Sequence, residues 1–507
     1  MSKTLKRGVL NARNSLSDPD LIAKYRALYA GGVHFHREID RFFCPNPNEP
    51  PSLAKDRKKE LFYTNHVGPI ADFFASMLFA APHNIRSIDA KTKEPVEVDA
   101  FYAEFADDID GGGEALPDFY RARFTEALVA GTAWIRARLP EATQAPASKV
   151  EYEEQGLGDA TLQPILSENV LDWETDETGG LLWAVIYDCK CPRPSPDKPR
   201  KEITETWTIL DNEKESVYQL TYDPDKTKPD DETDIPLVAE IPHRFPRVPL
   251  ICIRPRESLW LMNRVADIQV EHFKIENGLN WAIRRTCYPT PVFKLADPDV
   301  PPKMGQGSYI VIGKDDDFTF TSSGPAPFDV ISNRLDGIRD NIYRVTRQMA
   351  AGVNNNAAAV GRSADSKAQD AAATHVVLLA YADLVKDAIE ETMELISDAR
   401  GDIDVTFSVE GLDLFDDSAT AALVNTAKVA KDLAIPSDTF KREMAKRVAQ
   451  QLLPDLPQDV QDKIRDEIET ADLNPPLAVM PVPGDNDAGD QVSPNDGSEP
   501  PSSEPTD

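Results

Sequence analysis

Residues 258–286, SLWLMNRVADIQVEHFKIENGLNWAIRRT, and residues 330–349, VISNRLDGIRDNIYRVTRQM, decide the fold of this chain. In both stretches a seam of mainly apolar residues recurs at alternating steps of four and three, the pattern of a long α-helix with one packed side. The seam positions are Leu261, Val265, Ile268, His272, Ile275, Leu279 and Ala282, then Ile331, Leu335, Ile338, Ile342, Val345 and Met349. A core helix in a bundle carries the same pattern. We therefore expect two long helices whose seams pack within one chain, between chains, or both.

The segment between these two helices is short and has a different texture. The first helix is expected to stop at Tyr288-Pro289, because proline cannot continue an α-helix. Two strand-like runs, PVFKLA and SYIVIG, follow before about Pro327. The sequence thus predicts a small strand-containing excursion between two long helices.

The stretch after the second helix breaks the helical pattern. Residues 350–363, AAGVNNNAAAVGRS, contain Gly352, three consecutive asparagines and Gly361, a composition typical of a loop. A third long helix is predicted from Ser366 to Arg400, because Ser366 and Gln369 have the spacing of a capping box.

The regions before the first long helix divide at about Val150. The first 140 residues are predicted to be mostly helical, with one helix capped by Ser17 or Asp18. A second helix is expected over about 53–80, and a third from near Pro117 that includes Trp134. From Val150 to about residue 254, short apolar runs separated by Pro, Gly and Asp predict a β-rich region with hairpins.

The C-terminal part is predicted to contain one strand, short helices and a tail. The run DIDVTFSVEG is strand-like, and helices are expected near 417–433, 438–453 and 457–470. From Asp472 onward there are eight prolines, eight acidic residues and no Lys or Arg. Such a segment cannot bury enough apolar surface to fold, so we expect residues 472–507 to be disordered.

Composition narrows the class of protein. A chain of 507 residues is too long for one hydrophobic core, and its 41% hydrophobic and 28% charged residues are ordinary for a globular protein. No apolar run is long enough to span a membrane, and no apolar stretch follows the basic N-terminus as a signal peptide would require, so we expect the product to stay in the cytoplasm where it is made. Five cysteines in a chain of this length do not make a disulfide framework. With a net charge of −31, the chain as a whole lacks the excess of basic residues that an ordinary nucleic-acid binder uses to neutralise phosphates. A requirement for solubility alone would also explain this acidic charge.

The sequence carries no short catalytic signature. Gly313-Lys314 is followed by Asp315, so there is no phosphate-binding loop of the G-x-x-x-x-G-K-[ST] type, and zinc-protease, nucleophile-elbow and dinucleotide motifs do not occur. The acidic run that includes Asp108 and Asp110 precedes three glycines, which favours a solvated loop over a metal site. We therefore predict a protein that is not an enzyme and has no cofactor, catalytic residue or metal ligand.

The order of these elements resembles the portal (head-to-tail connector) proteins of long-tailed bacteriophages. The resemblance spans roughly Ser17 to Asp472 and includes local stretches in the family's order. These stretches are LYAGGVHFHREIDRFF, LFYTNHVGPIADFFASMLFAAP, DFYRARFTEALVAGTAWIRARLP and SENVLDWETDETGGLLWAVIYD. The resemblance to portal proteins implies an α+β, mainly helical subunit with wing, stem, clip and crown that forms a cyclic ring.

The resemblance also implies how the chain is divided. Residues 1–254 would form the wing, a helical part followed by a β-rich part, and 364–415 would add a long wing helix and a strand. The remaining parts would be 255–287 as first stem helix, 288–327 as clip, 328–349 as second stem helix, 350–363 as tunnel loop, 416–471 as helical crown and 472–507 as acidic tail.

Candidate DNA-facing residues come from the stem and the tunnel loop. The stem helices each have a net charge of +1, five basic against four acidic residues in 256–287 and four against three in 328–349, inside a strongly acidic chain. Weak, transient contacts with phosphates would suit such a wall, and salt bridges that stabilise the helices are the alternative role for each residue. The stem candidates are Arg264, Lys274, Arg284, Arg334, Arg339, Arg344 and Arg347, and the loop candidates are Asn354, Asn355, Asn356 and Arg362.

The function implied by the resemblance is a channel at one capsid vertex of the virion. Through it double-stranded DNA would be packaged and ejected, and the implied partners are further copies of the chain in a ring of twelve, the terminase, the major capsid and scaffolding proteins, and a head-completion adaptor. The alternatives are another virion structural protein, such as a head-tail adaptor or minor head protein, and a cytosolic enzyme of unrecognised class. Adaptors and minor head proteins are usually shorter, and they lack two long helices around a strand excursion.

Overall fold

The structure is a computed structural model of the chain. The residues that it describes are 3–45, 49–81, 83–89, 91, 100–140, 156, 158–192, 202–226, 228–287, 292–295, 310–313, 326–353, 366–402, 405–412, 428, 437–452 and 458–470. Helices make up about half of the described residues, and the strands are mainly antiparallel. The predicted α+β class is therefore confirmed.

The chain forms two compact units, Met1–Ala419 and Thr420–Asp507. Within the second unit, α13 (Asp438–Leu452) packs against α14 (Gln458–Thr470), and Lys446 of α13 forms ion pairs with Glu443 and Glu469. These two helices confirm the last two that the sequence predicts. The helix expected over 417–433 lies, apart from Lys428, outside the described residues.

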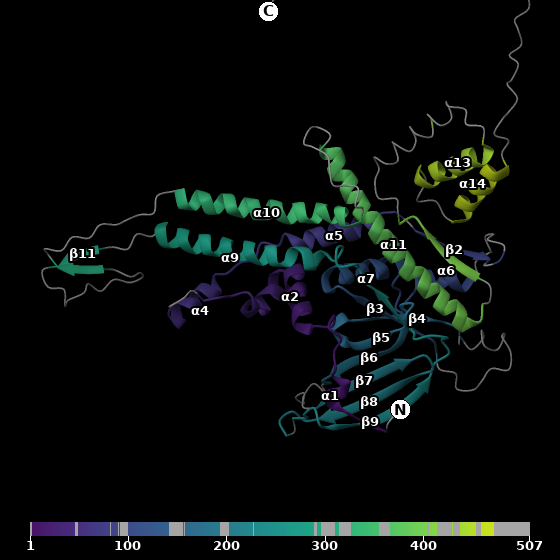
Figure 1. The fold of residues 1–507 in the computed structure, drawn as a ribbon, viewed down its shortest axis with the longest axis horizontal. Helices are drawn as coiled ribbons and strands as arrows, with labels where there is room; N and C mark the ends of the chain where they lie inside the picture. Colours follow the sequence, from purple (N-terminus) through teal and green to yellow (C-terminus); the bar gives the residue numbers. More distant parts are fainter. Residues whose placement is uncertain are drawn as a thin grey trace, which may run out of the picture. The chain divides into compact units, whose positions relative to one another are not determined.

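A six-stranded antiparallel sheet dominates the β-rich region of the first unit (Figure 1). Its order is β1-β9-β8-β7-β6-β5, so that five strands form a meander and the N-terminal strand adds to one edge. The strands are β1 (Thr4–Lys6), β5 (Val170–Thr175), β6 (Leu181–Lys190), β7 (Ile203–Asp211), β8 (Lys214–Tyr222) and β9 (Asp234–Pro242). The sheet confirms the predicted hairpins. The first residues, which were expected to lie in a helical region, instead pair with β9 through Leu5 and Ile235.

Smaller sheets join segments that are far apart in sequence. One has the order β10-β3-β4, and the other two are the pairs β13-β2 and β11-β12. The strands are β2 (Asn84–Asp89), β3 (Ala133–Arg138), β4 (Thr161–Ile165), β10 (Leu250–Ile253), β11 (Val292–Leu295), β12 (Ile310–Gly313) and β13 (Val405–Glu410). Strands β11 and β12 are parallel, and they confirm the two strand-like runs predicted between the long helices.

Helices in the first 140 residues are shorter and more numerous than the sequence suggests. They are α1 (Arg7–Leu10), α2 (Pro19–Ala30), α3 (Gly32–Arg37), α4 (Pro51–Lys59), α5 (Val67–Leu78), α6 (Ala100–Asp107) and α7 (Leu116–Ala130), with 3-10 turns η1 (Ile39–Arg41) and, further on, η2 (Ser167–Asn169). Asp18 caps α2 as predicted, since its carboxylate accepts hydrogen bonds from the backbone N–H groups of Asp20 and Leu21.

Two of the helix predictions in this region are wrong. The single helix expected over 53–80 is split into α4 and α5, because residues 61–66 leave the helical path and bond to α9. Trp134 lies in strand β3 and not in a helix. Helix α7 ends at Ala130 because Gly131 adopts a left-handed conformation with φ of 87°.

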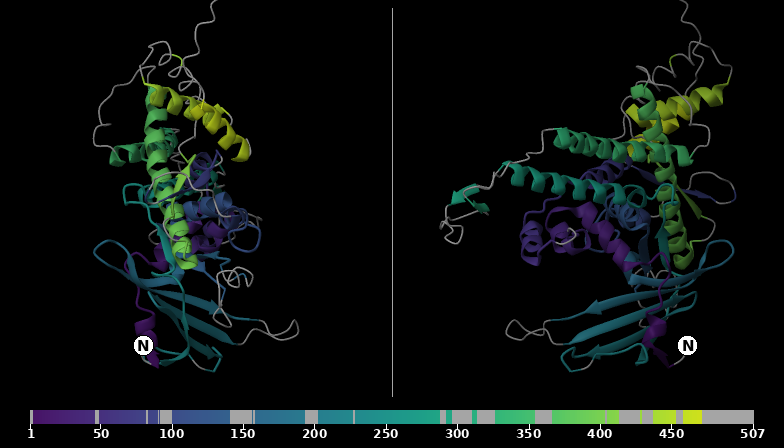
Figure 2. Two further views of the ribbon diagram at one scale, coloured as in Figure 1. Left: turned by 90° about the vertical axis from the view of Figure 1, so that its right-hand side faces the viewer. Right: turned by 60° about the vertical axis from the view of Figure 1, so that its left-hand side comes forward.

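Three long helices confirm the strongest periodic signals. They are α9 (Leu261–Cys287), α10 (Ala326–Val353) and α11 (Ser366–Arg400). Helices α9 and α10 contact each other and lie side by side and antiparallel, as Figure 1 and the right-hand view of Figure 2 show, and we call this pair the helical hairpin. Gly352, predicted to break the second helix, is still helical, so α10 continues beyond Met349 to Val353.

One large hydrophobic core holds the base of the hairpin within the first unit. It combines side chains from α2, α5, α7, α9, α10 and α11, with Phe124, Val265 and Tyr381 completely buried. The Tyr381 hydroxyl donates to the backbone oxygen of Leu259, just before α9. Burial of this size makes the hairpin base an integral part of the unit.

Candidate functional site on the helical hairpin

The two apolar seams predicted from the sequence face each other inside one chain. Leu261 and Val265 of α9 are fully buried, as is Ile342 of α10, and Ile338 is 2% exposed. Away from the core the seam residues Ile268, Ile275 and Ile331 are only half-buried. The seams therefore serve, at least in part, to pair the helices within the subunit.

A groove lies on one outward face of the hairpin. Its volume is about 280 Å³, and the residues that line it are Ile268, Glu271, Arg334, Gly337, Ile338, Asp340, Asn341 and Arg344. Arg334 bridges the two helices by donating to Glu271 at 2.7 Å, and Arg344 donates to the side-chain oxygen of Asn341 at 2.7 Å. Both guanidinium groups remain at the surface, so their charges are available to a partner but screened by salt.

The structure separates the seven basic residues that the sequence groups together. Arg334 and Arg344 line the groove, and Arg264 is exposed on the same side of α9 as Glu271, seven residues later. Arg284 instead turns to Glu60 at 2.7 Å, and Arg339 pairs with Asp336 and Asp340 of its own helix. Lys274 and Arg347 are exposed, and neither of them lines the groove. Arg264, Arg334 and Arg344 thus share the face on which the groove lies.

The predicted loop residues cannot be placed. Asn354, Asn355, Asn356 and Arg362 lie outside the described residues, which stop at Val353 and resume at Ser366. Their suggested contact with DNA stays a prediction.

On the opposite side of α9, two buried amides hold residues 61–66 against the hairpin. Asn277 accepts from the backbone N–H of Phe62 at 3.1 Å and donates to the Phe62 oxygen at 2.9 Å. Gln269 accepts from the backbone N–H of His66 at 3.3 Å and donates to the oxygen of Thr64 at 2.8 Å. We call these contacts the amide clamp. The sequence analysis missed it, although two amides eight residues apart on one helix were a usable signal.

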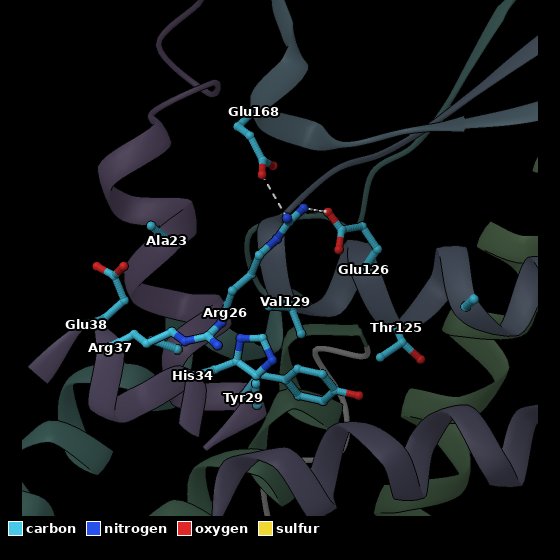
Figure 3. Close-up of a pocket in the computed structure, with 13 residues that line it drawn as sticks. Ala23, Arg26, Tyr29, His34, Arg37, Glu38, Thr125, Glu126, Val129 and Glu168 are labelled. Atoms are coloured by element: carbon cyan, nitrogen blue, oxygen red, sulfur yellow. Dashed lines mark hydrogen bonds and ion pairs between the residues drawn. The ribbon is translucent and has the colours of Figure 1, made fainter. Parts of the chain in front are cut away.

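A larger cleft, of about 690 Å³, lies among α2, α3, α7 and η2 (Figure 3). Arg26 reaches across it and forms ion pairs with Glu126 and with Glu168, the latter at 2.8 Å. Ser167 donates to the same Glu126 carboxylate at 3.1 Å. Because two carboxylates already neutralise Arg26, the central cation of this cleft ties elements together and is not free to bind an anion.

The described residues include no set of three or more His, Cys, Asp or Glu side chains arranged to hold a metal ion. The carboxylates of the acidic run before the glycines accept hydrogen bonds from the backbone of the same loop. Asp110 accepts from the N–H groups of Gly112 and Glu114, and Asp108 accepts from the N–H group of Gly113. These backbone hydrogen bonds lower the pKa of Asp110. The loop interpretation of this run is therefore confirmed.

None of the helices in the described part of the chain has the length and apolar character needed to cross a membrane.

The chain was compared with protein families, with curated protein sequences and with solved structures. No protein-family model matches it, and no curated protein sequence matches it. One solved structure that is similar is a chain of the "Virion of native gene transfer agent (GTA) particle", with 13% sequence identity and a TM-score of 0.35 over 86% of this chain and 99% of that one. A TM-score of this size carries no functional assignment.

Proposed function

We propose that this chain is a portal-type subunit that assembles into a ring around a channel for double-stranded DNA at one vertex of a virion. The observation that carries the proposal is the helical hairpin. Helix α9 begins in the common hydrophobic core of the α/β body. The chain then forms the small strand pair β11-β12, and α10 leads back to the same core. This architecture agrees with the order of elements through which the sequence resembles portal proteins.

The helical hairpin would be the stem, and residues 288–327 between its helices would be the clip, where the packaging terminase and later the head-completion or tail proteins dock. Residues 1–254 and 364–415 would be the wing and 416–471 the crown, in contact with the capsid and scaffolding proteins. A cyclic ring needs two different contact faces on each subunit, and the hairpin offers two outward sides beyond its paired seams.

The charge distribution supports a channel that touches DNA without holding it. Arg264, Arg334 and Arg344 share one exposed face, while the chain as a whole has a net charge of −31. Phosphates near this face would meet a few cations, one of which is already bridged to Glu271. Contacts of this kind are weak and depend strongly on salt.

The test is electron microscopy of the purified protein without added nucleotide or metal. We expect rings with a central channel, because the proposed assembly needs only copies of the chain. Light scattering over a range of salt and protein concentrations provides an independent measure of mass. A species that remains monomeric throughout that range, or closed particles without a channel, would contradict the proposal.

A further inference from the structure

Three titratable side chains meet next to the amide clamp, where residues 61–66 lie against the hairpin. The rings of His66 and His272 are 4.7 Å apart in an edge-to-face arrangement. Nδ1 of His272 is 3.7 Å from Oε2 of Glu276, one turn further along α9, which is too far for a hydrogen bond. His272 is 5% exposed. We call His66, His272 and Glu276 the histidine cluster.

Each member of the cluster has a buried polar atom without a hydrogen-bond partner among the described residues. These atoms are Nε2 of His66, Nδ1 of His272 and Oε2 of Glu276. The other carboxylate oxygen of Glu276 accepts a hydrogen bond from Thr64 at 3.0 Å. Unsatisfied buried atoms are rare in native proteins, and three in one cluster indicate a role other than simple packing.

The charged groups around the cluster are unevenly balanced. The charge of Arg339, on α10, acts on both imidazoles and lowers the pKa of each, although Asp336 and Asp340 partly compensate this charge. The side chains of the clamp, Gln269 and Asn277, are neutral. Glu276 is therefore the acidic group of the cluster itself, and it can neutralise one imidazolium but not two.

The surroundings favour the uncharged form of all three groups. Burial lowers the pKa of His66, and the charge of Arg339 lowers it further. Burial also lowers the pKa of His272, and the charges of His66 and Arg339 lower it further. Burial raises the pKa of Glu276, opposed by the hydrogen bond from Thr64.

We propose that the histidine cluster is a proton-operated latch that holds residues 61–66 against α9 while both imidazoles are neutral and releases them when both are protonated. Two imidazolium groups in edge contact would repel each other and Arg339, with one carboxylate to compensate. Release would open the amide clamp beside them and loosen the helical hairpin from the N-terminal helices. This property belongs to the single chain and does not depend on ring formation.

The direction of the pH dependence follows from the lowered histidine pKa values. When the latch opens, the imidazoles return to their ordinary pKa of about 6.5, so the open form binds protons first. The stability of the closed form relative to the open form is therefore greatest above that pH, and it decreases as the pH falls below it. The raised pKa of Glu276 acts in the opposite direction, in the pH range between its ordinary value of 4.5 and its raised value in the closed form.

The experiment is hydrogen exchange of the full-length protein, read at the backbone N–H groups of Phe62 and His66, which the clamp protects. After correction for the intrinsic exchange rate, we expect their protection to fall by about tenfold or more between about pH 6.5 and pH 5.5, since each additional proton bound on opening contributes about tenfold per pH unit. Amides in the six-stranded sheet should not change in this range.

Three variants make the test specific. The double variant H66Q/H272Q should remove the pH dependence at Phe62, whereas H34Q/H36Q, at two exposed histidines, should keep it. The variant E276Q removes the compensating carboxylate, so release should move to higher pH. If the double variant does not fold, E276Q still decides, because a purely structural role for Glu276 predicts lower protection at every pH and no shift of the transition.

Two results would overturn the latch. The first is protection at Phe62 that is independent of pH in the wild-type protein, or an E276Q variant without a shift. The second is a Zn²⁺-dependent rise in protection that is reversed by a chelator, because the cluster would then be a metal site and not a proton latch.

Discussion

Gly131 ends helix α7 with a backbone conformation that other residues adopt only with strain. Its φ is 87°, and a Cβ placed on it would lie 2.7 Å from the ring atoms Cε2 and Cζ2 of Trp260. Trp260 is itself fixed, since its ring N–H donates to the backbone oxygen of Val129 at 3.3 Å. The glycine is therefore required both for the turn and for the approach of Trp260, next to the start of the helical hairpin.

The variant G131A should lower the free energy of unfolding by about 2–4 kcal/mol, from backbone strain together with the displaced indole. The control is G113A: Gly113 has a φ of 93°, but a Cβ there would meet nothing within 4 Å. It should cost only the strain, about 1–2 kcal/mol. Denaturant unfolding of the two variants separates the effects, and equal losses would show that Trp260 adapts without cost.

At the scale of elements, the two ends of helix α10 lie in different environments. Near the body, Ile342 is fully buried in the main core, whereas Val330, near the distal end of α10, is 68% exposed. The bond between Arg334 and Glu271 links the helices in the stretch between them, at the surface. Packing at the base therefore supplies most of the stability, because exposed ion pairs contribute little.

The variant I342A should destabilise the protein by about 2–4 kcal/mol, because it leaves a cavity in a packed core. The matched variant V330A removes an exposed side chain from the same helix and should change the unfolding free energy by less than about 0.5 kcal/mol. Thermal or denaturant unfolding checks both. A large loss in V330A would mean that this end of α10 is covered, for instance by another copy in the ring.

At the scale of the whole molecule, the proposed channel makes a prediction for residues 350–363. Their asparagines can donate hydrogen bonds to phosphate oxygens without a fixed charge, so they would touch a moving duplex without trapping it. A flexible connector that happens to be rich in asparagine is the competing interpretation. In an infectious phage, replacement of Asn354, Asn355 and Asn356 by alanine should leave ring assembly intact.

Replacement of the same three residues by aspartate should impair packaging or retention of DNA, because each ring would carry many negative charges close to phosphates. Burst size and genome content measure the effect, and the alanine variant is its control. An aspartate mutant with normal burst size and full genomes would show that the loop does not approach DNA. Rings seen in the same preparations would keep the ring proposal separate from this outcome.

Local patterns in the sequence were enough to predict the long helices, the strands of the β-rich region and a helix cap at Ser17 or Asp18, of which the structure uses Asp18. Their determinants lie within the elements themselves: a seam with steps of four and three, alternating apolar runs, and a capping carboxylate. The same is true of the two strands between α9 and α10. In each case residues close in sequence decide the conformation.

Only the tertiary structure decided which distant segments meet. Residues 61–66 left the predicted helix because Asn277 and Gln269 of α9 bond to their backbone, more than 200 residues away. The seven basic residues of the two long helices likewise look equivalent in the sequence. In the structure Arg284 turns to Glu60, whereas Arg334 pairs with Glu271 on the face that it shares with Arg264 and Arg344. Hydrogen bonds and ion pairs between distant residues leave no periodic trace in the sequence, because their partners are chosen by the packing of the core.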